Sequence, residues 1–168
     1  MRSELSFYVV DTEVGFVGLV LSEHGLRHTT LPRNTRGQAL TDVAELGATR
    51  AAAESEVNGI STDVQTLGTG RHADVSQYVD WAGVTPFQRA VLQQTMRIPI
   101  GQTRSYGEIA ELAGSPRAAR AVGRVMATNP LPFIVPCHRV IGSDGTLHGY
   151  GGGLDLKERL LRAEGARV

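Results

Sequence analysis

Residues 134–141 read Ile134-Val135-Pro136-Cys137-His138-Arg139-Val140-Ile141, and they place the only cysteine of the 168-residue chain between two apolar runs. A lone cysteine in an apolar segment is usually a small hydrophobe. Here a base, His138, and a cation, Arg139, follow Cys137 directly. Both favour the thiolate, which is the nucleophilic form of cysteine. The sequence therefore predicts a reactive thiol at the end or bend of a buried segment.

A proton relay around this thiol is expected from the geometry of a strand. Adjacent side chains of a strand point to opposite faces, so His138 is expected to reach Cys137 through a bound water. A carboxylate would hold the imidazole in one tautomer. The candidate is Glu164, close to the end of a helix predicted over residues 155–165.

The sequence predicts neither a metal site nor a cofactor. No Cys and His residues have the spacing of zinc ligands, and a single cysteine cannot form an internal disulfide. The glycine-rich stretch at residues 149–153 lacks the preceding strand and the spacing of a phosphate-binding loop. It predicts a loop whose backbone can approach a flat ligand.

Three helices are predicted upstream of the cysteine. The first begins at Pro86 after the N-cap Thr85 and stops at Ile98-Pro99; the others run from about Ser105 to Ala113 and over residues 116–127. The last two, joined by a glycine-containing turn, have the outline of a helix-turn-helix. Most such pairs are packing units. Small residues and arginines on the last helix favour contact with DNA instead: Ala118, Ala119, Ala121 and Gly123, with Arg117, Arg120 and Arg124.

The charge distribution points to the same half of the chain. The formal charge is zero, yet residues 1–85 carry six Arg and eleven Asp or Glu, net −5, whereas residues 86–168 carry eleven Lys or Arg and six acids, net +5. A basic C-terminal half suits a polyanionic partner, although an ordinary solvated face can carry the same excess.

The N-terminal half predicts a small α/β domain. Leu5–Val10 and Phe16–Leu21 are predicted as a hairpin, residues 26–31 as a third strand, Gln38–Ser55 as a helix, and Asn58–Trp81 as strands and loops. A boundary in residues 80–85 divides the chain into domains 1–82 and 83–168. No apolar run approaches the roughly 20 residues of a membrane span, and no signal segment is present, so a cytoplasmic location is expected.

The C-terminal motifs together resemble the O6-alkylguanine-DNA alkyltransferases, from about Thr85 to Gly165. The matching segments are Ile134–Ile141, Asn129-Pro130, Gly151-Gly152-Gly153-Leu154, Ser105–Ala110 and Arg117–Gly123. The resemblance implies an α/β (α+β) fold. A small N-terminal RNase H-like α/β domain would support a mostly helical C-terminal helix-turn-helix domain that carries the active-site cysteine.

The resemblance also implies a function. The helix-turn-helix would enter the minor groove of double-stranded DNA, and O6-alkylguanine, with O4-alkylthymine as a second substrate, would be flipped out of the stack. The alkyl group would pass irreversibly and stoichiometrically to Cys137, without metal or cofactor, in a protein expected to be a monomer. The implied catalytic residues are Cys137, His138, Glu164, Asn129 and Tyr106. The implied substrate-binding residues are Met126, Val140, Tyr150 and Gly151, and the DNA-binding residues are Arg120, Tyr106, Ala119, Arg117 and Arg124.

Three alternatives stay open at the level of sequence. A non-catalytic protein could bind alkylated bases and flag them for another repair pathway, but such relatives lack the cysteine. A Cys-His hydrolase would use the same nucleophile and would need an oxyanion hole. A helix-turn-helix regulator would leave Cys137 unexplained.

Overall fold

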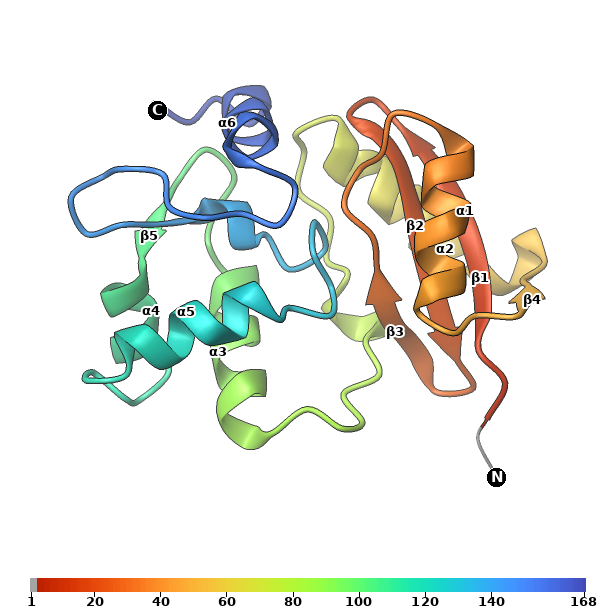
Figure 1. Cartoon of the computed structure of the whole chain (residues 1–168), viewed down its shortest axis with the longest axis horizontal. Helices are drawn as coiled ribbons and strands as arrows, with labels where there is room; N and C mark the ends of the chain where they lie inside the picture. The colour runs from red at the N-terminus through yellow and green to blue at the C-terminus, as the bar shows by residue number, and fades with distance from the viewer. Residues whose placement is uncertain (1–2) are drawn as a thin grey trace. The chain divides into compact units, whose positions relative to one another are not determined.

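The computed structural model describes residues 3–168, and the chain forms two compact units (Figure 1). The first unit contains the chain up to Trp81 together with Pro130–Ile134, and the second contains Ala82–Asn129 and Val135–Val168. Within the first unit, the Thr29 hydroxyl donates to the Pro132 carbonyl at 2.6 Å. The sequence did not predict that the segment just before the cysteine would belong to the N-terminal unit.

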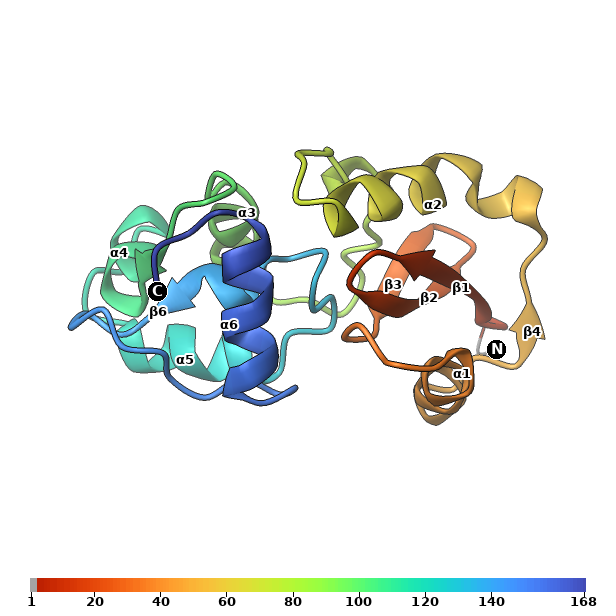
Figure 2. The same cartoon turned by 90° about the horizontal axis from the view of Figure 1, so that it is seen from above.

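The first unit is a mixed sheet with a helix on each face (Figure 2). The strand order is β3-β2-β1-β4, with β4 parallel to β1 and the other neighbours antiparallel. Both faces of β2 are covered, so its apolar residues are buried without alternation. The predicted hairpin and third strand are confirmed. The elements are β1 (Ser6–Thr12), β2 (Gly15–Ser22), β3 (Gly25–Thr29), α1 (Arg36–Glu45), β4 (Arg50–Ala51) and α2 (Glu54–Gly68).

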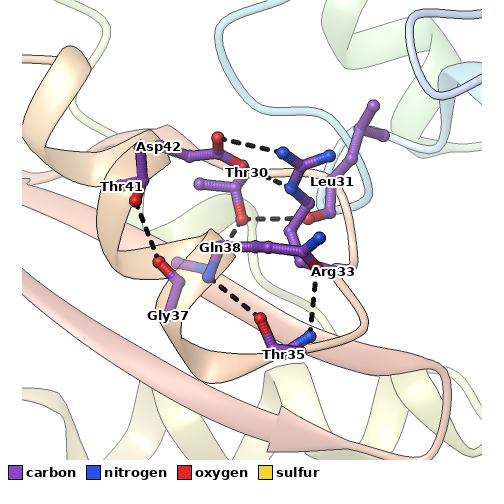
Figure 3. A network of polar contacts seen from close by, with 9 residues as sticks. Thr30, Leu31, Arg33, Thr35, Gly37, Gln38, Thr41 and Asp42 are labelled. Atoms are coloured by element: carbon purple, nitrogen blue, oxygen red, sulfur yellow. Dashed lines mark hydrogen bonds and ion pairs between the residues drawn. The ribbon is translucent and has the colours of Figure 1, made fainter.

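Polar contacts fix where α1 begins (Figure 3). The Thr35 hydroxyl accepts the Gln38 N–H at 3.1 Å, and the Gln38 side chain accepts the Thr35 N–H at 3.2 Å. This reciprocal cap satisfies two N–H groups at the helix start. Arg33, in the loop before the cap, pairs with Asp42 on the helix at 2.9 Å. The loop that leaves β3 is therefore tied to the helix that covers the sheet.

The predicted helix over Gln38–Ser55 is wrong in its second half. Helix α1 ends at Glu45, and Gly47 has a φ of 91°. A left-handed glycine just beyond the last turn is a common way to end a helix. The chain then returns to the sheet as β4, whose two residues pair with Ser6 and Phe7.

The prediction of strands and loops over Asn58–Trp81 is wrong in its first half. Residues 58–68 belong to α2, and the remainder is loop apart from a short 3₁₀ turn, η1 (Ser76–Tyr78). The apolar residues Val57, Ile60 and Val64 have helical spacing and are buried. Glycine, asparagine, serine and threonine between them have low helix propensity, which hid the pattern. Packing of the apolar stripe on the sheet outweighs that propensity.

The second unit is mostly helical and confirms the helices predicted there. A capping box of Thr85 and Gln88 starts α3, and one of Ser105 and Glu108 starts α4. Helix α5 begins later than predicted, because the Ala118 N–H bonds to the Ser115 carbonyl at 2.9 Å and closes a turn around Pro116. The elements are α3 (Pro86–Met96), β5 (Arg104–Ser105), α4 (Tyr106–Leu112), α5 (Ala119–Ala127), η2 (Cys137–Arg139), β6 (Val140–Ile141) and α6 (Leu154–Ala163).

Among residues 3–168, no helix is both long and apolar enough to cross a membrane.

Gly18 tests how tightly α1 packs on the sheet. A Cβ at this position would lie 2.5 Å from Val43 Cγ1 and 2.8 Å from Thr30 Cγ2. We expect Gly18→Ala to lower the free energy of unfolding in urea by about 1–3 kcal/mol, because a buried β-branched side chain cannot yield freely. Gly37→Ala, in α1, is the control, since its Cβ would meet only Thr35 Oγ1 at 4.0 Å. Equal effects of the two substitutions would contradict the packing.

Candidate active site

The backbone around Cys137 is a 3₁₀ turn, so the predicted strand at this position is wrong. The Cys137 N–H bonds to the Val135 carbonyl at 2.7 Å, and the Arg139 N–H bonds to the Pro136 carbonyl at 2.8 Å. Pro136 has a φ of −76°, close to the value that its ring imposes, and starts the turn. Cys137, His138 and Arg139 are all buried. The turn, rather than the alternation of a strand, decides where the three side chains point.

His138 lies against the carboxylate that the sequence suggested. Its Nε2 is 2.8 Å from Glu164 Oε1, and both side chains are nearly inaccessible to solvent. Glu164 is the C-cap residue of α6, a position that the helix end fixes in space. The predicted pairing of His138 with Glu164 is therefore present in the structure.

This pairing determines which imidazole nitrogen can accept a proton. Burial lowers the pKa of His138, although the hydrogen bond and the charge of Glu164 oppose the shift. The ring is therefore neutral near pH 7, with Nε2–H donating to Glu164 and a lone pair on Nδ1. Among the described residues, Nδ1 is buried and has no hydrogen-bond partner. The site thus contains a neutral base whose accepting atom is unoccupied by the protein.

Arg139 serves a different purpose from the one expected. The sequence suggested that its charge would favour the thiolate. Its guanidinium instead donates to both Glu164 oxygens, at 2.8 and 2.7 Å, and to the Ile98 carbonyl at 2.8 Å. Burial alone would raise the pKa of Glu164, but hydrogen bonds from His138 and Arg139 outweigh it and lower the pKa to about 2. Glu164 is therefore an anion shared by a neutral imidazole and a guanidinium.

Lys157 is part of the site and was missed from the sequence. Only 1% of this residue is exposed, and its Nζ donates to the Val140 carbonyl at 2.8 Å and to the His148 carbonyl at 3.1 Å. The available signal was its spacing in α6, since Leu160 and Leu161 lie three and four residues further along the same buried face. A lysine is ordinarily assigned to the solvated face, which is why the pattern was overlooked.

Two tyrosines lie within electrostatic range of Cys137. Tyr106, the first residue of α4, is half-buried, and burial followed by the charge of Cys137 raises its pKa. The buried Tyr150 hydroxyl has no hydrogen-bond partner among the described residues, and burial is the main cause of its raised pKa. Both phenols stay protonated near pH 7. They are therefore able to donate hydrogen bonds to a ligand beside the thiol.

The other predicted site residues lie on α5, in the turn before it and in the loops that follow it. Asn129 comes directly after α5, and its side-chain amide lies 3.4 Å from the Val135 carbonyl, a long hydrogen bond. Met126 is half-buried and Gly151 is exposed. Ala119 begins α5, and a Cβ on Gly123 would meet no atom within 4 Å. The arginines of this region are exposed: Arg117, Arg120 and Arg124.

The described residues offer no metal-binding cluster, since no group of three or more His, Cys, Asp or Glu side chains in residues 3–168 could hold an ion. The polar groups gathered around Cys137 can instead perform proton transfer and nucleophilic attack.

Known proteins share both the sequence and the fold. Residues 86–166 match the family model described as 6-O-methylguanine DNA methyltransferase, DNA binding domain. A methylated-DNA–protein-cysteine methyltransferase of Mycobacterium leprae (strain TN) is 41% identical over 159 residues, which cover 95% of this chain and 92% of that protein. A protein of the same name from Mycolicibacterium paratuberculosis is 60% identical over 104 residues, or 60% of this chain and 62% of that one. The crystal structure of Mycobacterium tuberculosis OGT in complex with DNA has a TM-score of 0.71 at 34% identity, and covers 95% of this chain and 93% of that chain.

The lowered pKa of Glu164 predicts a specific acid sensitivity. A carboxylate with a folded pKa of about 2 contributes stability above its unfolded pKa, roughly 4.3, and loses it as the pH falls toward 2. Over this pH range, we expect protonation of Glu164 alone to lower the free energy of unfolding of the wild type by on the order of 2–3 kcal/mol. The Glu164→Gln variant should be less stable than the wild type at pH 7. Its free energy of unfolding should not show this decrease as the pH falls.

The measurement is denaturant unfolding as a function of pH. Glu158→Gln is the control, because Glu158 lies on the same helix in an exposed pair with Arg162. The control should keep the wild-type pH dependence between about pH 5 and 2. A Glu164→Gln profile parallel to that of the control would show that Glu164 is not the buried anion described above.

Proposed function

Because the chain belongs to the family of methylated-DNA–protein-cysteine methyltransferases, we propose that it repairs DNA by moving an alkyl group from guanine O6 to Cys137. The transfer is irreversible and consumes the protein after one turnover. The observation that carries this proposal is the buried, neutral His138. Its Nε2 is held by Glu164, and its Nδ1 has no protein partner in residues 3–168.

The proposed chemistry is a single displacement. The Cys137 thiol gives its proton, through a water, to His138 Nδ1, and Glu164 stabilises the imidazolium that forms. The thiolate attacks the alkyl carbon as the carbon–oxygen bond breaks, and its electron pair becomes the new carbon–sulfur bond. The electrons of the broken bond stay on the guanine, whose oxygen or ring nitrogen takes up a proton equivalent to the one that the thiol gave up. All the groups required belong to the protein or the substrate, so no cofactor is needed.

Recognition of the flipped base would use backbone and phenol groups around the thiol. The carbonyls of Cys137 and Val140 would accept the exocyclic amine of guanine. The Tyr106 hydroxyl and the Gly151 N–H would donate to N3 and O6, and Met126 and Tyr150 would pack on the ring. O4-alkylthymine offers a similar alkyl ether and is the proposed second substrate. Asn129 would link α5 to the turn that carries Cys137.

DNA would be held by α4 and α5. We propose that α5 enters the minor groove of the duplex, where Ala119 and the open surface at Gly123 permit close approach. Arg120 would fill the gap left by the flipped base, while Arg117 and Arg124 would contact phosphates. Binding and transfer are thus assigned to residues 83–168, and support to residues 1–82. A monomer is sufficient for this arrangement.

The main competing function is a non-catalytic protein that binds alkylated bases and flags them for another pathway. Cys137 and its complete set of polar partners favour transfer, because a binder has no use for a buried base next to a thiol.

Transfer to Cys137 predicts a defined change of mass. After incubation with an oligonucleotide duplex that contains O6-methylguanine, intact-mass spectrometry should show one added methyl group per protein, located at Cys137. Cys137→Ala should gain nothing yet still bind the duplex, since affinity comes from phosphate and base contacts. Binding by the wild type without any mass gain would support the non-catalytic function instead.

Intercalation by Arg120 predicts a defect confined to duplex substrates. Loss of the side chain leaves an unstacking cost of a few kcal/mol without compensation, so Arg120→Ala should slow repair of the duplex by about 10- to 100-fold at saturating protein. Reaction with free O6-benzylguanine, which has no stack to leave, should be nearly unchanged.

Arg124→Ala is the matched control, an exposed arginine of the same helix with a proposed phosphate contact. Its defect should appear as a salt-dependent loss of affinity that vanishes at saturation. If Arg120→Ala behaves in the same way, Arg120 is a phosphate ligand and does not enter the stack. Equal loss on duplex and free base would indicate a displaced Cys137.

A further inference from the structure

Lys157 is a buried cation without a carboxylate partner. Its two hydrogen-bond acceptors are backbone carbonyls, and no Asp or Glu among the described residues lies within ion-pair distance of its Nζ. Transfer of an ammonium from water into a protein interior is costly, and carbonyl dipoles offset only part of the cost. Burial accordingly lowers the pKa of Lys157. A charge retained under these conditions calls for a negative group nearby.

Every other ionisable group of the site is either neutral or already paired, so one group remains that can supply this negative charge. Arg139 and Glu164 neutralise each other through two hydrogen bonds. Burial keeps His138 neutral, and it keeps the Tyr106 and Tyr150 phenols protonated. The exposed His148 ring lies beside Thr146 and Asp144. Cys137 remains, and its negative form raises the pKa of Lys157, just as Lys157 lowers that of His138.

We propose that Lys157 is a positioning residue whose ammonium is the counter-charge of the Cys137 thiolate and holds the Val140 carbonyl in place. The same Nζ also bonds to the His148 carbonyl, so one side chain of α6 connects β6 with the loop over residues 142–153. A carbonyl oxygen has two lone pairs, so Val140 keeps one for a ligand. Only the consequence for alkyl transfer rests on the proposed function, because the ionisation of Cys137 and of Lys157 can be measured without DNA.

The composition of the chain makes this pairing directly measurable. Cys137 is the only cysteine and Lys157 the only lysine. The ultraviolet absorbance of the thiolate therefore reports Cys137 alone, and a lysine labelled with nitrogen-15 at Nζ reports Lys157 alone. Neither measurement requires DNA or alkyl transfer, so a failure of the proposed function would not affect them.

The first experiment is a pH titration of the thiol in DNA-free protein. In Lys157→Met the pKa of Cys137 should rise, since the isosteric side chain lacks the charge. Once the pKa exceeds 7, each further unit of increase lowers the thiolate fraction at pH 7, and the rate of reaction with iodoacetamide, by about tenfold. Lys157→Arg, which keeps the charge, should recover part of the loss. Arg162→Met, which removes an exposed cation from the same helix, should titrate as the wild type does.

Alkyl transfer by Lys157→Met should fall by at least about tenfold at pH 7 and recover at high pH, where the thiolate forms unaided. A thiol titration of folded Lys157→Met that coincides with the wild type would overturn the proposal, whatever the rate of transfer. If the variant does not fold, the labelled wild type supplies the test. Conversion of Cys137 into a thioether with iodoacetamide should lower the pKa of Lys157, and an unchanged pKa would overturn the proposal equally.

Discussion

The ion pair of Glu164 with Arg139, shared with His138, is the interaction on which the site depends. One carboxylate at the end of α6 accepts hydrogen bonds from two consecutive residues of the turn that carries Cys137. It fixes the imidazole tautomer and neutralises a guanidinium that would otherwise be buried alone. If Glu164 were lost, His138 would lose its orientation and Arg139 its counter-ion together. These contacts therefore hold the end of α6 against the turn that carries Cys137, although 25 residues separate Arg139 from Glu164.

Neutrality of the imidazole is the second constraint. A buried histidine beside a carboxylate could be held as a cation, which would leave no atom to accept a proton. Here burial outweighs the hydrogen bond and charge of Glu164 and lowers the pKa of His138, and the positive charges of Arg139 and Lys157 lower it further. The thiol therefore has beside it an imidazole that Glu164 orients through Nε2 and whose Nδ1 carries no proton near pH 7.

Local signals predicted the second unit better than the first. The N-cap Thr85 and the helix start at Ser105 placed two helices, and the sequence around Cys137 suggested the pairing of His138 with Glu164, although not the 3₁₀ turn itself. Helix α2 was missed because burial against the sheet, which residues far away in sequence provide, overrides its weak propensity. Lys157 was missed for a related reason: its acceptors are backbone carbonyls that only the folded chain brings to it. Side-chain identity does not reveal such partners.

The same groups explain why a thiol activated in this way would serve once. On the proposed chemistry, His138 acts by accepting a proton from sulfur and Lys157 by balancing the charge that remains. A thioether has neither a proton to give nor a negative charge to balance, so both side chains lose their function when the carbon–sulfur bond forms. Regeneration would require a second nucleophile to displace an uncharged, strongly bonded cysteine sulfur from carbon.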